Sequence, residues 1–357
     1  MKNYFKKAVL DMAGYVSPPQ REYRVKLNQN ESPFDVPPHI KAELAQVVEL
    51  LAWNRYPVNE SPALRQKLAA RHHVQPQQIL LGNGSNQLFQ TLLTAALEPG
   101  DAVVYTVPTF SLYELYTDVY QGRRIEIPQP PGAPYPLHEV LRAVERERPK
   151  IIYLCSPNNP TGDEIELEIV REICRSNDGL VFFDEAYAEF TEQTAIPLLA
   201  EFDNLIVSRT FSKAFSMAGL RFGYFVAGAP LIEQLGKVNL PYNVNLFTEQ
   251  AALRLLDAET ETAANVAYLV RERRRVFREM QKMPGMTVFP SRANFLLMRG
   301  PEPLDLFQAL KMRGVLVRDV GGYPLLRGFQ RVSIGFAEEN DLFLSVLGEI
   351  LSNEARS

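Results

Sequence analysis

Cysteine and histidine are scarce in this sequence of 357 residues. The two cysteines, Cys155 and Cys174, have neither a CxxC spacing nor an accompanying cluster of histidines, so the sequence indicates no zinc site and no disulfide framework. The four histidines avoid the ends of the predicted strands, and helix or surface positions are the better interpretation for them. We therefore expect no metal and no histidine-based triad, and a reducing cytoplasm suits the two thiols.

An excess of positive charge and long apolar runs are also missing. Lys and Arg number 38 against 42 Asp and Glu, a net charge of −4, so no basic surface for nucleic acid is expected. The only apolar run before Asp11 has three residues, too few for a signal-peptide core or a membrane span. One basic cluster, RERRRVF at 271–277, lies within a helical pattern and is interpreted as a solvated helix face. We expect neither a nucleic-acid nor a membrane partner.

Short apolar runs alternate with amphipathic segments between about residues 80 and 230. This pattern is typical of a mostly parallel sheet between helices, with strands buried on both faces. The predicted strands are 101–107, 123–127, 150–155, 180–186, 204–210 and 221–227. Residues 245–283 form a periodic stretch without helix breakers and predict one long or kinked helix, after which strand signals resume. The order predicts an α/β fold with a large domain and a smaller one.

Polar segments stand where the predicted strands end, and in open α/β sheets ligands bind at that edge. These segments are GNGSNQ at 82–87, PTF at 108–110, SPNNPTG at 156–162, DEAY at 184–187 and SRTFSK at 208–213. A glycine-rich turn that opens a helix offers backbone N–H groups and the positive end of the helix dipole to a phosphate. Thr210, Ser212 and Arg221 could complete such a pocket, although many glycine turns are plain helix caps.

Asp184 and Lys213 together indicate a particular chemistry. Asp184 taken alone fits the cap of a turn equally well. A carboxylate that faces a pyridine nitrogen, however, keeps this nitrogen protonated and makes the ring an electron sink for a carbanion. Lys213 could hold such a cofactor as a Schiff base and, once released, act as the base that moves a proton. The pair predicts a pyridoxal-phosphate enzyme.

The motifs SPNNPTG, DEAY and SKAFSMAGLRFGY, in this order, resemble the signatures of the fold-type I aminotransferases. The resemblance runs from LNQNESPF (27–34) through NRYP (54–57) to the segment 315–340, and it is in particular to the histidinol-phosphate aminotransferases. It implies a large domain at 30–244 with a mostly parallel seven-stranded sheet between helices. It also implies a smaller α/β C-terminal domain at 245–357 and an N-terminal arm, 1–29, that packs with the small domain.

The resemblance implies that the cofactor is pyridoxal 5'-phosphate, with Lys213, Asp184 and Tyr187 as the catalytic residues. Asp184 would pair with the ring nitrogen, and Asn159 and Tyr187 would bond the phenolic oxygen. Phe110 would stack on the ring and Ala186 would pack on its other face. The residues implied to hold the phosphate are Gly84, Ser85, Asn86, Thr210, Ser212 and Arg221.

For the substrate, the resemblance implies a clamp of Arg318 and Arg331 on an anionic group, helped by Tyr15 and Asn159. The implied reaction converts histidinol phosphate and 2-oxoglutarate, reversibly, to imidazole acetol phosphate and glutamate, a step of histidine biosynthesis. Tyr56 would reach the cofactor phosphate from a neighbouring subunit, which implies a homodimer.

The sequence departs from the family pattern in three segments. Asn86 and Gln87 stand where an acidic pair is common, Phe110 replaces the more usual tyrosine, and FDVPP at 34–38 lacks a frequent tyrosine–glycine pair. These differences concern the substrate more than the cofactor. The alternatives are an aromatic amino acid aminotransferase, a lyase of the phosphothreonine decarboxylase type, and a non-catalytic binding module or regulator derived from this fold.

Overall fold

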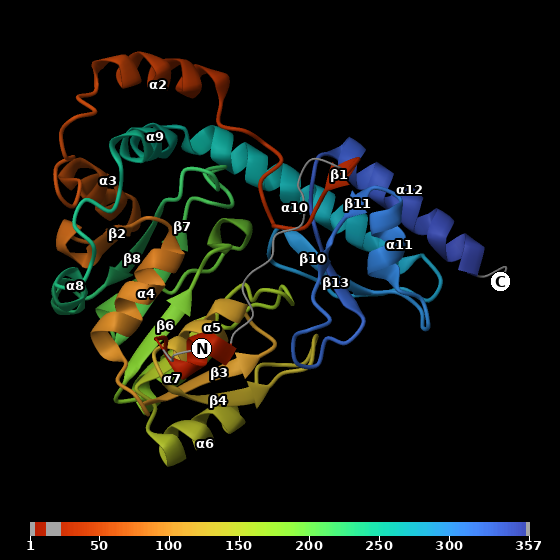
Figure 1. The fold of residues 1–357 in the computed structure, drawn as a ribbon, viewed down its shortest axis with the longest axis horizontal. Coiled ribbons are helices and arrows are strands. Elements are labelled where there is room, and N and C mark those ends of the chain that lie inside the picture. The colour runs from red at the N-terminus through yellow and green to blue at the C-terminus, as the bar shows by residue number, and fades with distance from the viewer. Residues whose placement is uncertain (1–3, 12–22, 355–357) are drawn as a thin grey trace.

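The computed structural model describes residues 4–11 and 23–354, which form two lobes bridged by a long helix (Figure 1). The larger lobe contains a seven-stranded sheet in the order β2-β8-β7-β6-β5-β3-β4. Its strands are β2 Ile79–Gly82, β3 Ala102–Val107, β4 Arg123–Pro128, β5 Ile151–Cys155, β6 Leu180–Asp184, β7 Leu205–Thr210 and β8 Gly223–Ala227. Only β8 runs antiparallel to its neighbours, so the predicted mostly parallel sheet is confirmed.

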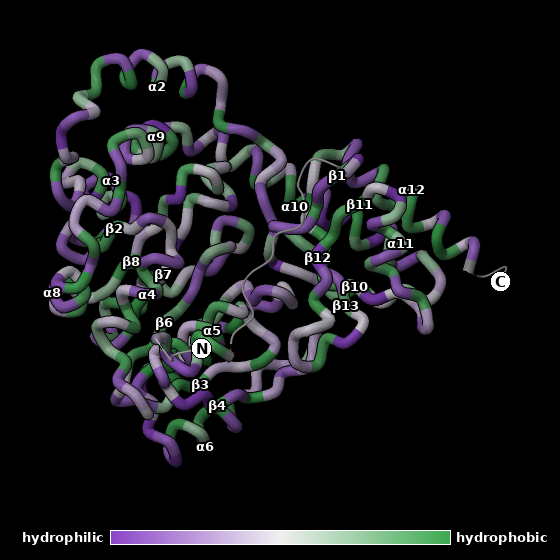
Figure 2. Tube along the Cα trace, in the orientation of Figure 1, coloured by the Kyte–Doolittle hydropathy of each residue, from purple (hydrophilic) through white to green (hydrophobic). Residues whose placement is uncertain are grey.

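Alternate residues of the strands enter two separate cores, one on each face of the sheet. On β5, Ile152 and Leu154 belong to one core, and Ile151 and Tyr153 belong to the other. This follows from the two-residue period of a strand, which points successive side chains to opposite faces. Hydrophobic segments accordingly run along the central strands, while many outer turns are hydrophilic (Figure 2).

Helices cover both faces of this sheet. One core is completed by α4 Ser85–Ala96, α5 Ser111–Val119 and α8 Ala229–Gly236. The opposite core is completed by α3 Pro62–His72, α6 Leu137–Glu147, α7 Leu167–Ser176 and α9 Leu246–Asp257. The lobe also carries α1 Lys7–Asp11 and α2 Pro38–Leu50. Among the described residues, none of the helices has both the length and the apolar character needed to cross a bilayer.

All six predicted strands form, each within two residues of its predicted bounds. The seventh, β2, has only four residues and did not stand out as an apolar run. The expectation of burial on both faces is wrong for β4, an edge strand that is largely exposed or half-buried. The other edge strand, β2, is buried because α3, α4 and α8 pack against it.

The predicted helix at 245–283 is in fact two helices, α9 and α10 Glu259–Gln281, so of the two predicted forms the kinked one is nearer. Asn245 caps α9, because its side chain accepts a hydrogen bond from the Thr248 N–H at 2.9 Å. Ala258 ends α9 and precedes α10 with φ −96° and ψ 39°. No glycine or proline marks the break, and the sequence pattern therefore did not reveal it.

The smaller lobe contains an antiparallel sheet in the order β12-β13-β10-β9, with α11 Leu306–Met312 and α12 Ala337–Glu354. Its strands are β9 Thr287–Val288, β10 Phe295–Arg299, β12 Arg318–Asp319 and β13 Phe329–Ser333. A separate pair joins β1 Val25–Lys26 to β11 Val315–Leu316 in parallel. This pairing leads residues 28–30 from the smaller lobe toward the strand ends of the larger one.

Candidate active site

A cavity of about 430 Å³ lies where β5, β6 and β7 end and where α4 and α5 begin. It brings together most of the residues predicted to form the site. From the larger lobe these are Ser85, Asn86, Phe110, Asn159, Asp184, Ala186, Tyr187, Thr210, Ser212, Lys213 and Arg221, and from the smaller lobe Arg318 and Arg331.

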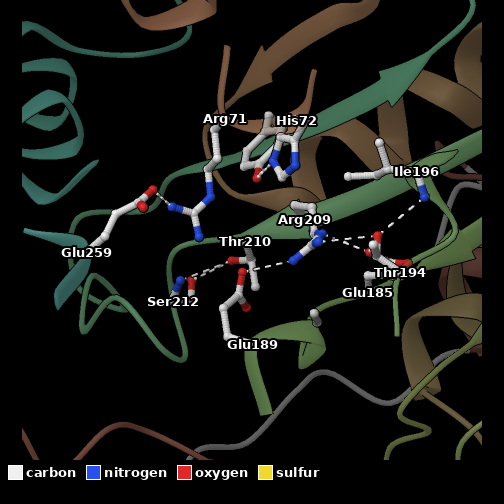
Figure 3. A network of polar contacts seen from close by, with 12 residues as sticks. Arg71, His72, Glu185, Glu189, Thr194, Ile196, Arg209, Thr210, Ser212 and Glu259 are labelled. Carbon is white, nitrogen blue, oxygen red and sulfur yellow. Dashed lines mark hydrogen bonds and ion pairs between the residues drawn. The ribbon is translucent and has the colours of Figure 1, made fainter. Parts of the chain in front are cut away.

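One end of the cavity is suited to an anion. Helix α4 follows Gly84, which has φ 78° and offers no side-chain cap, so the first-turn N–H groups of α4 point outward in the way that binds phosphate. Thr210 Oγ1 lies 3.0 Å from Ser212 Oγ (Figure 3), which also accepts a hydrogen bond from Arg221 Nη1 at 3.2 Å. A Cβ at Gly84 would lie 2.7 Å from Arg221 Nη2, so a side chain there would displace this guanidinium.

Asp184 ends β6 as a buried carboxylate. Its Oδ2 accepts a hydrogen bond from Tyr113 Oη at 2.9 Å, and its Oδ1 accepts one from the Ala186 N–H at 3.1 Å. Burial raises the pKa of the Asp184 carboxyl to about 6, against the opposing effect of these two bonds. Most of this carboxyl is therefore ionised at neutral pH, and its two hydrogen-bond donors favour the ionised form.

Lys213 lies in the turn after β7, and its Nζ donates a hydrogen bond to the carbonyl oxygen of Gln29 at 2.9 Å. Burial, together with the positive charges of Arg331 and Arg221, lowers the pKa of this amine to about 7. A large fraction of the Lys213 amine is thus neutral at physiological pH, which is the state that a nucleophile or a general base needs.

Arg331 on β13 connects the two lobes at the cavity. Its Nη1 donates to Asn159 Oδ1, and its Nη2 donates to the carbonyl oxygen of Asn28 at 2.8 Å. Nearby, Asn30 Nδ2 donates to Tyr187 Oη at 2.8 Å, and burial raises the pKa of the Tyr187 phenol to about 12. These bonds fix the side chains of Asn159 and Tyr187 side by side on one wall.

The cavity carries more positive than negative charge. Four cationic side chains line it, those of Lys213, Arg221, Arg318 and Arg331, against the single acid Asp184. Such a concentration of cations in a partly enclosed space favours a ligand with several negative groups. No group of three or more His, Cys, Asp or Glu side chains that could hold a metal occurs among residues 4–11 and 23–354.

Of the predicted residues that the structure describes, Tyr56 and Gly84 do not line the cavity. Tyr56 is 81% exposed and stacks on Tyr242, with ring centroids 4.7 Å apart. Tyr15 lies outside the described residues. Gly84 does not line the cavity itself but positions the start of α4.

Sequence reasoning missed several residues that contact the site. Asn28, Gln29 and Asn30 supply two carbonyl oxygens and one amide to Arg331, Lys213 and Tyr187. Their segment was quoted as part of the resemblance, but no role followed from it. The polar NQN string after an apolar strand was the available signal. Tyr113 was hidden in the apolar pattern of α5, and its bond to Asp184 needs the tertiary structure to be seen.

Comparison with known proteins agrees with this geometry. The fold and the cavity define an aminotransferase. The chain belongs to the aminotransferase class I and II family, whose model matches residues 23–347, and its curated relatives of similar length are histidinol-phosphate aminotransferases. The histidinol-phosphate aminotransferase of Ruminiclostridium cellulolyticum is 37% identical over 339 residues, which are 94% of this chain and 95% of that protein.

Solved structures show the same fold. The histidinol-phosphate aminotransferase of Sinorhizobium meliloti, solved in complex with pyridoxal-5'-phosphate, superposes with a TM-score of 0.88 at 24% identity and covers 98% of both chains. The L-threonine-O-3-phosphate decarboxylase of Porphyromonas gingivalis superposes with a TM-score of 0.80 at 22% identity, over 92% of this chain and 99% of that one. At these identities the two structures establish the fold alone, and the reaction has to be inferred from the residues of the site.

Proposed function

We propose that this enzyme uses pyridoxal 5'-phosphate to transfer an amino group reversibly between histidinol phosphate and 2-oxoglutarate, giving imidazole acetol phosphate and glutamate. The observation that carries the proposal is a single cavity that combines Lys213 and Asp184 with cations at both ends. The relatives' shared name supports the choice of substrate. A location in a reducing cytoplasm is part of the same proposal. So are domain boundaries at 29/30 and 244/245, with α9 at the start of the second domain packed against α2 and α3 of the larger lobe.

The residues present fit this cofactor. The Gly84 turn, with Ser85, Asn86, Thr210, Ser212 and Arg221, would hold its phosphate. Asp184 would face the ring nitrogen, Asn159 and Tyr187 would bond the phenolic oxygen, and Phe110 and Ala186 would pack on the two ring faces. When bound, pyridoxal phosphate supplies an electron sink that stabilises negative charge at the substrate's α-carbon.

Lys213 would bind the cofactor covalently through Nζ and, when the amino donor displaces it, would act as the base. A pKa of about 7 allows Lys213 to take a proton from the α-carbon and to give it up again at neutral pH. Asp184 would keep the ring nitrogen protonated through its negative charge. Tyr187 and Asn159, fixed by Asn30 and Arg331, would orient the ring relative to Lys213.

Tyr113→Phe is expected to lower activity at acid pH and to leave it near the wild-type level at pH 8. The substitution removes a hydrogen bond that favours the ionised form of Asp184, so the pKa of this carboxyl rises above its present value of about 6. Because the ionised form is the active one, the acid limb of the kcat profile should move to higher pH. The measurement is kcat from pH 5.5 to 8.5.

Tyr116→Phe on the same helix is the matched control for this substitution. Tyr116 lies in α5 as Tyr113 does, but it is only half-buried and does not line the cavity. Its profile should coincide with that of the wild type. Identical profiles for Tyr113→Phe and Tyr116→Phe would refute the role of Tyr113.

Arg331 and Arg318, helped by Tyr15 and Asn159, would hold the anionic group of the substrate. Arginine binds phosphate and carboxylate equally through paired N–H donors, so these residues accept the phosphate of histidinol phosphate and the carboxylate of 2-oxoglutarate in turn. Arg331 is 7% exposed and is supported by Asn159 and Asn28, which keeps its guanidinium in one place for both substrates.

Histidinol phosphate should give a kcat/KM roughly 10²-fold or more above that of phenylalanine or tyrosine, because the site offers paired donors for a dianion as well as space for a ring. Steady-state kinetics with 2-oxoglutarate as acceptor measure this ratio. A higher kcat/KM for an aromatic amino acid would make the enzyme an aromatic aminotransferase. Release of carbon dioxide from phosphothreonine without any keto acid would make it a decarboxylase.

The homodimer is proposed from an exposed apolar surface that includes Tyr56. Large apolar side chains gather on two segments of this surface, namely Leu50, Trp53, Tyr56 and Val58 on one and Leu240, Tyr242 and Phe247 on the other. Exposed apolar clusters of this kind mark protein interfaces. In a two-fold dimer Tyr56 would approach the anion-binding end of the partner's cavity.

Mixing an impaired variant with an inactive one tests this arrangement. Tyr56→Ala should lower kcat/KM by roughly 10- to 100-fold, the effect of losing one hydrogen bond to a charged phosphate. If Tyr56 acts across the dimer, subunits of Tyr56→Ala and Lys213→Ala that are mixed and allowed to exchange will form one complete site per hybrid dimer and recover activity. Activity equal to the sum of the separate variants would contradict a shared site.

A further inference from the structure

Within the described part of the chain, the smaller lobe contributes three side chains to the active-site cavity, and all three come from one hairpin. Arg318 lies on β12 and Arg331 on β13, and these two residues are direct partners across the antiparallel sheet. The third residue, Tyr323, lies in the turn 320–328 that connects the two strands. The two arginines that would hold the anionic group of the substrate therefore stand beside a tyrosine that the proposed mechanism does not use.

The turn that carries Tyr323 is anchored on both sides of this residue. The Tyr323 N–H donates to the Val320 carbonyl oxygen at 3.0 Å, and the Leu326 N–H donates to the Tyr323 carbonyl oxygen at 3.2 Å. Val320 and Leu326 are buried with Leu297 and Phe329 in a small core, against which Tyr323 packs. Tyr323 is thus held at the cavity wall before a ligand binds, so little conformational entropy is lost when it makes a contact.

The same turn contains a strained residue. Leu325 has φ 64°, in the left-handed region, although its side chain is 49% exposed and gains little from burial. Such a conformation persists only where the surrounding structure enforces it, and it is frequent at sites that hold a ligand. The strain at Leu325 is consistent with a turn whose shape serves to present Tyr323.

The Tyr323 hydroxyl makes no hydrogen bond within the part of the chain that the structure describes, and its side chain is half-buried at the cavity. Other hydroxyls of the cavity are engaged. Tyr187 Oη accepts a bond from Asn30, and Thr210 bonds Ser212 at the end suited to the cofactor phosphate. Because a tyrosine hydroxyl can donate a hydrogen bond, that of Tyr323 is available to an anion in the cavity.

Phosphate and carboxylate differ in the number of oxygens that they present to such donors. One arginine can engage both oxygens of a carboxylate through two parallel N–H groups. A phosphate monoester has three terminal oxygens, so a third donor beside two arginines still finds an acceptor. When a carboxylate occupies the clamp instead, the half-buried Tyr323 hydroxyl can keep water as its partner, and no polar group is left unpaired.

We propose that Tyr323 donates a hydrogen bond to the phosphate of histidinol phosphate, beside Arg318 and Arg331, and thereby distinguishes the two anions that share this clamp. The inference rests on the proposed function and adds a specificity-determining residue to it. Tyr323 would strengthen the binding of the phosphate in one half-reaction and leave the binding of the carboxylate in the other unchanged.

Single-turnover reactions of the cofactor-loaded enzyme with separate amino donors test the proposal, with the cofactor absorbance as the signal. Tyr323→Phe should lower the second-order rate constant for histidinol phosphate by roughly 10- to 100-fold, the effect of losing one hydrogen bond to a charged group. The rate constant for glutamate should stay within about twofold of the wild type, because water replaces the lost hydroxyl contact. Histidinol, which lacks the phosphate, should react equally with both enzymes.

Leu325→Asn is the matched control for this substitution. It changes an exposed residue of the same turn that does not line the cavity, and asparagine tolerates a φ of 64°. Its rate constants should equal those of the wild type with all three donors.

The outcomes separate this inference from the proposed function. A loss in Tyr323→Phe that is equal for histidinol phosphate and for glutamate or histidinol, or no loss with any donor, would overturn the role of Tyr323 while the transamination itself stands. A wild-type enzyme that reacts with glutamate but not with histidinol phosphate would overturn the proposed function and this inference together.

Discussion

Replacing Lys213 with alanine is expected to lower kcat by about 10⁴-fold or more, since a positioned general base alone contributes roughly 10²–10⁴-fold and the covalent attachment is lost as well. The fold should remain intact, because within the described part of the chain Lys213 makes a single hydrogen bond, to Gln29. The measurements are kcat with histidinol phosphate and the thermal midpoint of the cofactor-loaded protein. A kcat within tenfold of the wild type would remove Lys213 from the mechanism.

Two further variants test whether catalysis depends on the neutral form of the Lys213 amine. Lys213→Arg keeps a positive charge, but arginine does not lose its proton near pH 7, so it should be as inactive as alanine. Lys26→Ala removes another half-buried lysine of the same region that does not line the cavity, and its kcat should stay near the wild-type value. In the wild type, kcat should rise as the pH passes upward through about 7, because Lys213 is a free amine once the amino donor has displaced it and its neutral fraction increases there.

Asp184→Asn is expected to lower kcat by roughly 10²–10³-fold, an effect comparable to the loss of one preorganised electrostatic contact at a transition state. Asparagine has nearly the same shape, but it has no charge with which to keep a ring nitrogen protonated. The same change should not reduce the thermal midpoint of the cofactor-free protein at pH 7. An equal loss of activity and stability would indicate a structural role instead.

The stability part of this prediction follows from the pKa of Asp184. Its value in the folded protein, about 6, lies above the ordinary value of 3.8. A carboxyl with a raised folded pKa stabilises the fold most at pH values below 3.8, and this contribution is lost as the pH rises through 6. At pH 7 the charged Asp184 is therefore a cost to the folded state, and asparagine removes that cost.

Glu185→Gln is the contrasting control, because Glu185 is the buried carboxylate next to Asp184 and its contacts stabilise the fold. It pairs with Arg209 Nε at 2.8 Å and accepts bonds from Thr194 and the Ala195 N–H (Figure 3). Breaking a buried ion pair from one side costs about 3–5 kcal/mol, so this variant should lose stability. Its kcat per folded, cofactor-loaded site should stay within severalfold of the wild type.

Much of the larger lobe could be predicted from local patterns alone. The strand end at Thr210 was placed correctly and the one at Asp184 within two residues, because apolar runs, glycine turns and the polar residues after them are adjacent in the chain. The break at Ala258 and the exposure of β4 were not predicted, since the first involves no helix breaker and the second depends on the place of the strand in the sheet and on how helices cover that edge. Neither property is encoded within a short window of sequence.

The sequence by itself determined the kind of chemistry, because Asp184, Asn159, Tyr187, Lys213 and Arg221 are specific residue types at the ends of consecutive strands. Only the tertiary structure decided the pKa values and the contacts of these side chains. Residues 28–30 reach Lys213 across more than 180 positions of the chain, Tyr113 supports the Asp184 carboxylate from a helix, and Arg273 is buried within a basic run. The physical reason is that desolvation and charge proximity, which set these pKa values and contacts, depend on which distant segments pack together.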